Sequence, residues 1–170
     1  MSHSRFNSIT RNASPEKVKG IKILAPASGK VEIISDPALL ALGEGVDIYL
    51  TSHHVVSPIN GTVVDIQPSH ARVIIQAKNK LKFLIQLPSS YTAQMGLGIG
   101  CIVKKGESVA SGQPILNLDL YKIQQHLKPI TLQFLILDSA PFGRIQVPHK
   151  TVEVNQDTIF SLVALPKHIK

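Results

Sequence analysis

Two stretches of the chain repeat one pattern, and this repeat constrains the fold more than any other feature. Residues 23–34 read ILAPASGKVEII and residues 55–66 read VVSPINGTVVDI, so both fit the frame apolar-apolar-small-Pro-x-x-Gly-x-Val-x-x-Ile. In each copy the Pro-x-x-Gly segment predicts a tight turn, because proline presets its φ angle and glycine tolerates positive φ. The β-branched residues around it predict strands. We therefore expect two copies of one strand-turn-strand unit.

The rest of the chain continues in the same style. Gly, Pro, Asn or Ser interrupts it about every eight to twelve residues, a spacing typical of an all-β sandwich or barrel. Two stretches favour short helices instead, 36–43 (DPALLALG) and 119–128 (DLYKIQQHLK). The β-favouring runs are IKILA, KVEIIS, VDIYL, HHVVS, GTVVDIQ, ARVIIQ, LKFLIQL, CIVKK, PILNLDL, ITLQFLIL, RIQV, TVEV and FSLVAL.

Length and composition predict the domain organisation. A chain of 170 residues with 44% apolar side chains can bury one hydrophobic core, but hardly two. Residues 1–17 are polar and lack periodicity, so we expect a flexible basic tail there and a single β domain over residues 18–170. No apolar stretch approaches the length of a bilayer, and MSHSRFNSIT lacks the apolar core of a secretory signal. A cytoplasmic location is expected.

The net charge of +7 does not by itself predict a nucleic-acid partner. The lysines are scattered and are not interleaved with aromatic residues, so no nucleic acid is expected. The basic tail suggests at most a peripheral contact with an anionic membrane surface.

Metal and cofactor chemistry has little support in the sequence. His53 and His54 would point to opposite faces of a strand, and no His-x-His or His-x-x-x-Asp pair occurs, which counts against a zinc peptidase. Cys101 is the one cysteine and is expected to fill the core. We expect no metal and no cofactor.

Seven segments, taken in order and spacing, point to one family. They are ILAPASGKV, GEGVDI, VVSPINGTV, QPSHARV, LKFLIQL, VKKGESVASGQPILNLDL and KPITLQFLIL. Together they resemble the glucose-type enzyme IIA domain of the bacterial phosphoenolpyruvate:sugar phosphotransferase system, over roughly residues 18–165. The resemblance implies a compact β-sandwich built as a duplicated hybrid motif. It also implies protein partners: an HPr-like phosphocarrier, a sugar-transporter domain or a regulatory target.

The resemblance implies a specific chemistry at two positions. Family members accept a phosphoryl group from HPr on a histidine ring nitrogen, supported by a second histidine. His70 falls on the supporting position, and Gln86 falls on the phosphoacceptor position. An amide nitrogen is delocalised into its carbonyl and offers no nucleophilic lone pair. We therefore expect that histidine phosphorylation has been lost, and zinc binding that needs both histidines is put in doubt.

Three further departures from the family pattern surround Gln86. Pro68 stands where a threonine is typical, Pro88 where the family has glycine, and Ser90 where it has aspartate. Together with Gln86, these changes indicate an altered role for the site.

The resemblance also suggests a binding surface. The apolar ring that docks HPr is matched by Leu40, Ile66 and Leu84, and Asp119 matches an acidic residue near the site. With Ser90, these residues form the expected contact surface.

The strand register around this site is conditional on one hairpin loop. A three-residue loop over residues 77–79 would place His70 directly opposite Gln86, with Cβ atoms about 5 Å apart. A two-residue loop of residues 78–79 would place Ala71 opposite Gln86 instead.

Three functional hypotheses follow. The favoured one is an enzyme IIA-like binding or regulatory module that is not phosphorylated and is not an enzyme. The alternative is an active phosphocarrier of sugar uptake that uses His70 as its acceptor. A biotinyl or lipoyl carrier is weaker, because Lys78 in AKNK lacks the flanking residues of such carriers.

Overall fold

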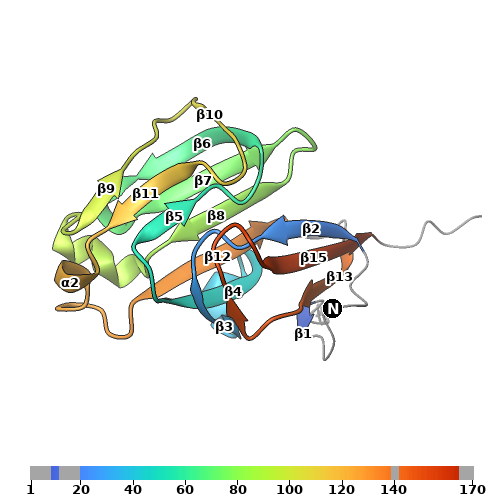
Figure 1. The fold of residues 1–170 in the computed structure, drawn as a ribbon, viewed down its shortest axis with the longest axis horizontal. Helices are drawn as coiled ribbons and strands as arrows, with labels where there is room; N and C mark the ends of the chain where they lie inside the picture. The colour runs from blue at the N-terminus through green and yellow to red at the C-terminus, as the bar shows by residue number, and fades with distance from the viewer. Residues whose placement is uncertain (1–8, 12–19, 139–141, 165–170) are drawn as a thin grey trace, which may run out of the picture.

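The computed structural model describes residues 9–11, 20–138 and 142–164, which form three β-sheets (Figure 1). The largest sheet contains, in spatial order, β10 (Ser108–Val109), β6 (Gly61–Gln67), β7 (Arg72–Ala77), β8 (Lys82–Gln86), β12 (Thr131–Leu137), β4 (Gly43–Leu50), β3 (Gly29–Ile33) and β14 (Thr151–Val152). The second sheet is β1 (Ile9–Arg11), β13 (Phe142–Val147), β15 (Thr158–Ala164) and β2 (Ile21–Leu24). The third is β5 (His54–Val56), β11 (Pro114–Leu118) and β9 (Ile99–Cys101).

The two smaller sheets pack against the inner face of the largest sheet and share one hydrophobic core with it. This core includes Phe160 of the second sheet, Leu116 of the third, and Phe83 and Phe134 of the largest. The ring centroids of Phe83 and Phe134 lie 5.8 Å apart, and those of Phe134 and Phe160 lie 5.0 Å apart. Such tilted contacts stabilise a core beyond simple burial. The predicted all-β sandwich is confirmed.

The outer face of the largest sheet carries a second, smaller apolar cluster. It consists of the buried residues Ile34, Ile74, Leu84 and Leu135, with Leu39 and Leu40 of α1 (Pro37–Leu40) packed on it. Asp36 caps α1, since its side chain accepts a hydrogen bond from the amide of Ala38 at 2.9 Å.

The two sequence repeats form the predicted strand-turn-strand units, β2 to β3 and β5 to β6. Equivalent residues make equivalent backbone bonds. Ala25 donates to Asp157 (2.8 Å) and accepts from Asn155 (2.9 Å), while Ser57 donates to Gln113 (2.8 Å) and accepts from Gly112 (2.8 Å). Each repeat is therefore held at its turn by a partner loop from a distant part of the chain.

The helical predictions were right in place and too long. The stretch 36–43 yields α1, and the stretch 119–128 yields α2 (Leu120–Ile123). After α2 the chain tightens, because the amide of Gln125 bonds to Lys122 only three residues back, at 3.3 Å. No described helix is long and apolar enough to cross a membrane.

Two other segments differ from the sequence expectation. CIVKK (101–105) was expected as a strand, but β9 covers Ile99–Cys101, because a turn closes directly afterwards through the bond from Glu107 to Lys104 (3.1 Å). Within the predicted tail, residues 9–11 form β1, which adds in parallel to the edge of β13. An edge strand offers unpaired backbone groups to such a segment. The rest of the tail lies outside the described residues, and the predicted boundary at residue 18 stays a prediction.

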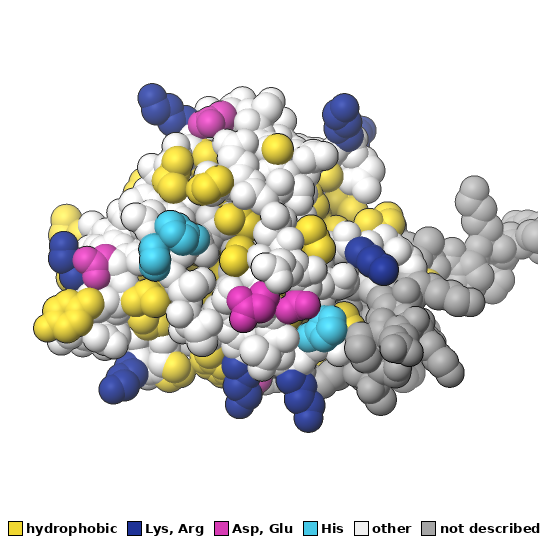
Figure 2. Space-filling model, viewed as in Figure 1, with side chains coloured by type: hydrophobic (Ala, Val, Ile, Leu, Met, Phe, Trp, Pro, Cys, Tyr) yellow, Lys and Arg dark blue, Asp and Glu magenta, His cyan; other side chains and the backbone are white. Residues whose placement is uncertain are grey.

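Charged side chains are dispersed on the face seen in Figure 2. Lysine and arginine side chains stand apart from one another around its rim, and no continuous basic patch forms on this face. This distribution matches the scattered lysines of the sequence.

Candidate functional site

His70 lies in a short 3-10 turn, η2 (Pro68–His70), between β6 and β7, and not on a strand. Pro68 opens this turn, where its fixed φ angle is compatible with a helical start. Ala71 then takes a left-handed conformation (φ 59°) that redirects the chain into β7. His70 is 6% exposed, so its ring is almost fully enclosed.

Both predicted registers of the β7–β8 hairpin were wrong. Gln76 pairs with Lys82 and Val73 with Ile85, so the pairing is displaced from either prediction. The loop has three residues, 78–80, one position later than the predicted three-residue loop, and the amide of Ala77 closes it by donating to the carbonyl of Leu81 at 2.8 Å. Lys80, not Asn79, adopts positive φ (69°), and the Asn79 side chain accepts a hydrogen bond from the amide of Leu81 at 3.2 Å.

His70 and Gln86 nevertheless come together. The amide of Leu87, next to Gln86, donates to the carbonyl of His70 at 2.9 Å and holds η2 against the end of β8. Nδ1 of His70 lies 3.2 Å from the Ser69 hydroxyl oxygen.

The surroundings keep His70 neutral. Burial lowers the pKa of His70, and the nearby Arg72 guanidinium lowers it further, while the hydrogen bond to Gln86 partly opposes both. Burial and Arg72 therefore both favour the uncharged form of the ring.

Gln86 has a second partner that the sequence analysis missed. Its Nε2 donates to Oε1 of Gln133 at 2.9 Å, and the two residues are directly opposite on β8 and β12. Gln86 is 4% exposed, so its amide depends on protein partners. A polar residue inside the apolar run ITLQFLIL was the available signal, and it is the same signal that singled out Gln86.

The polar row continues across the sheet. Gln133 is opposite Asp47, and Asp47 is opposite Glu32. Oδ1 of Asp47 is buried and has no hydrogen-bond partner among the described residues. Burial, followed by the charges of Glu32 and Asp36, raises the pKa of Asp47 to about 6. The sequence analysis missed Asp47 as well, although it interrupts the run VDIYL.

The three predicted docking residues do not form one group. Leu40 and Leu84 belong to the outer-face cluster, where Leu84 is 1% exposed and fully packed. Ile66 packs instead against the main core on the inner face. A strand presents alternate residues to opposite faces, and a β-bulge between Val63 and Asp65 shifts that alternation before Ile66.

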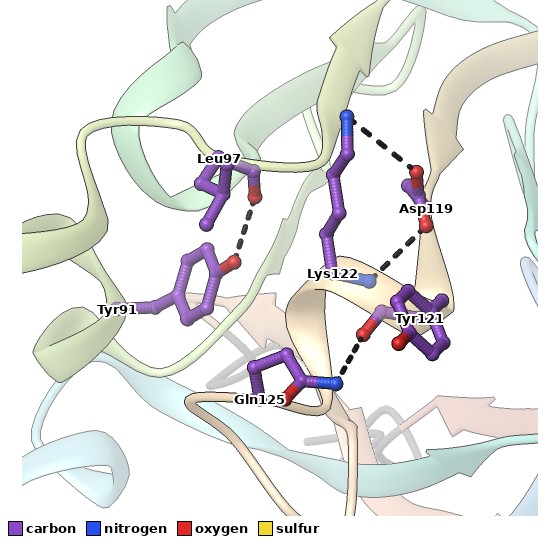
Figure 3. Close-up of polar contacts among 6 residues, drawn as sticks. All are labelled: Tyr91, Leu97, Asp119, Tyr121, Lys122 and Gln125. Carbon is purple, nitrogen blue, oxygen red and sulfur yellow. Dashed lines mark hydrogen bonds and ion pairs between the residues drawn. The ribbon is translucent and has the colours of Figure 1, made fainter.

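The altered segment after Gln86 forms a second 3-10 turn, η3 (Ser89–Gln94). Pro88 precedes it, its carbonyl accepts the amide of Tyr91 at 2.9 Å, and Ser90 is exposed on the turn. Tyr91 is buried and its hydroxyl donates to the carbonyl of Leu97 at 2.7 Å (Figure 3). The amide of Gly96 bonds back to Ser69 at 3.2 Å, which ties η3 to η2.

Asp119 caps α2. Its carboxylate accepts from the amide of Lys122 at 3.1 Å and pairs with the Lys122 ammonium at 3.8 Å (Figure 3). Asp119, Lys122 and His53 line a cleft of roughly 660 Å³ with the β9 backbone.

The two adjacent histidines do not point apart as predicted. The ring centroids of His53 and His54 lie 4.0 Å apart, because His53 precedes β5 in a bend and is not in extended strand geometry. Across the described ranges, no group of three His, Cys, Asp or Glu is arranged to hold a metal ion.

Comparison with known proteins identifies relatives over most of the chain. The family model for EIIA 1 of the phosphoenolpyruvate-dependent sugar phosphotransferase system matches residues 21–142. A glucose-specific EIIA component of Staphylococcus epidermidis is 32% identical over 145 residues, covering 82% of this chain and 87% of that protein. A glucose-specific EIIA component of Staphylococcus aureus is 29% identical over 148 residues, covering 84% and 89%.

The fold also has a solved counterpart. The glucose permease IIA from Mycoplasma capricolum superposes with a TM-score of 0.71 at 19% identity, covering 84% of this chain and 95% of that one. At this identity the likeness establishes the shared β-sandwich.

Proposed function

The chain belongs to the EIIA 1 family of the phosphoenolpyruvate-dependent sugar phosphotransferase system, and from this premise we propose that it is a binding or regulatory member that carries no phosphoryl group. The observation that carries the proposal is the chemistry of Gln86 at the position where the family resemblance expects the acceptor histidine. A carboxamide has no basic lone pair on nitrogen and cannot form a phosphoramidate as imidazole does.

His70 is poorly placed to take over the acceptor role. His70 is 6% exposed, the Ser69 hydroxyl lies 3.2 Å from its Nδ1, and the amide of Leu87 holds η2 against the end of β8. A phosphocarrier partner would have to displace these groups before a ring nitrogen could attack. This geometry favours the regulatory function over the alternative, a phosphocarrier that uses His70.

The partners we propose are proteins. An HPr-like carrier, a sugar-transporter domain or a regulatory target would contact the surface around η3, where Ser90 is exposed, and the surface of α1, whose Leu40 packs on the cluster that contains Leu84. In this role the chain requires no cofactor and no nucleic acid.

Phosphotransfer from HPr tests the proposal. The protein is incubated with phosphoenolpyruvate, enzyme I and HPr, beside the glucose-specific EIIA component of S. epidermidis as a positive control. We expect no acid-labile phosphate on this chain by mass spectrometry. Phospho-His70 in substantial yield, lost in a His70→Ala variant, would establish the phosphocarrier function instead.

A complementary test restores the family's residues at the site and measures how much phosphorylation is regained. Gln86→His alone should recover weak phosphorylation, because Pro68 and Pro88 still lack the hydroxyl and backbone N–H donors of the family pattern, and Ser90 lacks its carboxylate charge. Loss of one oriented donor commonly lowers a rate by about 10²-fold. Adding Pro68→Thr, Pro88→Gly and Ser90→Asp should raise transfer well above the single variant. If Gln86→His alone reached the control rate, the surrounding site would not have been remodelled.

A further inference from the structure

We propose that the cleft between β9 and the start of α2 binds a small phosphate monoester, through the Lys122 ammonium and the N–H donors of His53 and Asn117. The inference goes beyond the proposed function, because neither His70 nor Gln86 is among the described residues that line this cleft. It rests on the shape of the cleft and on the balance of donors and acceptors in it.

Gly100 and Asn117 form the floor of the cleft. They lie opposite each other on β9 and β11, and both are exposed on the outer face of the third sheet. Gly100 does not have the positive φ that favours glycine, and a Cβ added to it would meet only Asn117, at 3.3 Å from the carbonyl oxygen and 3.8 Å from Cβ. Neither backbone conformation nor packing excludes a methyl group at position 100, and its absence leaves room above the sheet.

Backbone hydrogen bonds hold the walls of the cleft in place. The amide of Leu118 donates to the carbonyl of His53 at 2.9 Å, and the amide of Asp119 donates to the carbonyl of Gly98 at 2.8 Å. The ring of His53 also lies against that of His54, with centroids 4.0 Å apart. The cleft is therefore preorganised, and its volume of roughly 660 Å³ is typical of a small-molecule site.

The free hydrogen-bonding capacity of the cleft lies on the donor side. The Asp119 carboxylate is already engaged, since one oxygen accepts from the amide of Lys122 at 3.1 Å and the other lies 3.8 Å from the Lys122 ammonium (Figure 3). An exposed ion pair of this length is weak, so the ammonium keeps N–H groups for a ligand. The side-chain amide of Asn117 and the ring of His53 add further donors. Such a site suits an anion with several acceptor oxygens.

A phosphate monoester fits both parts of the cleft. Its charged oxygens match the Lys122 ammonium, and its organic part would lie over Gly100 beside the ring of His53. The family belongs to a phosphoenolpyruvate-dependent sugar phosphotransferase system, so the monoester has two natural sources, phosphoenolpyruvate and a phosphorylated sugar.

An NMR titration of the unaltered, ¹⁵N-labelled protein tests the proposal and separates the two sources. Phosphoenolpyruvate and glucose 6-phosphate are added separately, in physiological salt that screens exposed charges. At least one of them should shift the amide signals of Gly98 and Gly100 and the side-chain amide signals of Asn117 to saturation, and the tighter one identifies the source. If neither compound gave a saturable shift at these signals, the proposal would be wrong.

Two further compounds test the ligand class. Glucose lacks the charge and should not shift the signals, while inorganic phosphate lacks the part that lies over Gly100 and should bind more weakly than the monoester. Glucose or inorganic phosphate binding as tightly as the monoester would overturn the assignment to this class.

Variants test the residues. Lys122→Ala should weaken binding by about tenfold or more, because a hydrogen bond from a charged group is lost. Gly100→Ala should weaken it as well, by raising the floor of the cleft. Lys105→Ala removes an exposed lysine that does not line the cleft and should leave the affinity unchanged.

An equal loss of affinity in Lys105→Ala and Lys122→Ala would show that only net charge matters, and would contradict the site. Lys122 is an exposed side chain, so its variant decides the question even if Gly100→Ala perturbs the sheet. None of these readouts involves phosphotransfer. Phosphorylation of His70 would refute the proposed function and leave the binding result at the cleft unchanged.

Discussion

The two repeats share a sequence frame but place their last residue on opposite faces of the largest sheet. Val31 and Val63 are equivalent and are both buried in the main core. Three residues further on, Ile34 lies in the outer-face cluster, whereas Ile66 packs on the inner core. The cause is the bulge between Val63 and Asp65 in β6, for which the paired residues of β3 have no counterpart.

The difference shows which part of the repeat is structural and which is free to vary. The Pro-x-x-Gly turn and the strand entry are the same in both copies, because each glycine lies against the backbone of a neighbouring strand. A Cβ on Gly29 would lie 2.0 Å from the carbonyl oxygen of Tyr49, and one on Gly61 would lie 2.5 Å from that of Gln76. Beyond this point, side-chain placement depends on the local strand pairing.

The largest expected effect on stability comes from placing a Cβ where Gly29 and Gly61 lie against the neighbouring backbone. Gly29→Ala should lower the free energy of unfolding by several kcal/mol, on the order of 3 or more, and Gly61→Ala by a smaller amount, since both require backbone to move. Urea denaturation measures both values.

Gly106→Ala is the control for these glycine substitutions. Gly106 has positive φ (89°) but no atom within 4 Å of an added Cβ, so the substitution should cost about 1 kcal/mol from conformation alone. If Gly29→Ala cost no more than Gly106→Ala, close packing would not explain the repeated glycine.

The fold was accessible from the sequence because its signals are local and repeated. The run GTVVDIQ (61–67) coincides with β6, and glycines mark the beginnings of β3, β4 and β6. The site was accessible only in part. His70 and Gln86 lie near each other as expected, but neither predicted strand register is right, because the left-handed Ala71 and the positive φ of Lys80 depend on single φ angles that residue type does not dictate. The bulge before Ile66 was hidden for the same reason.

The second prediction tests, by energetic coupling between pairs of residues, which side chains share a face of the largest sheet. Leu40→Ala and Leu84→Ala share the outer-face cluster, so their destabilisations should be non-additive by about 0.5 kcal/mol or more. Leu84→Ala and Ile66→Ala lie on opposite faces and should add within about 0.3–0.5 kcal/mol. Each value comes from a double-mutant cycle of unfolding free energies. Strong coupling between Ile66 and Leu84 would mean that the two side chains share a face after all.

The repeats also differ in how their acidic residues are compensated. On β6, Asp65 is paired with Arg72 at 3.5 Å. On β3, Glu32 is opposite Asp47, and like charges on opposing positions destabilise a sheet. Glu32 has Lys30 at 3.3 Å, but Oδ1 of Asp47 has no hydrogen-bond partner in the described part of the chain.

The smallest expected effect follows from this uncompensated carboxylate. The folded protein raises the pKa of Asp47 from 3.8 to about 6, so between these values it binds more protons than the unfolded chain. The free energy of unfolding contributed by Asp47 therefore falls as pH rises through this window, and the penalty is fully present above about pH 6. Asp47→Asn should stabilise the protein at pH 7.5 by about 1 kcal/mol, a figure reduced for the partial exposure of the group, and should give no gain near pH 3.5. The lowered pKa of His70 acts in the opposite direction, since the stability that His70 contributes is lost as pH falls below 6.5. This contribution is the same in the wild-type protein and in the Asp47→Asn variant, so it cancels in their difference.

Asp138→Asn removes the same charge from an exposed position at the end of β12 and controls for net charge. Urea denaturation of all three proteins across this pH range gives the comparison, and a gain for Asp47→Asn that is equally large at pH 3.5 would show that ionisation of Asp47 is not its source.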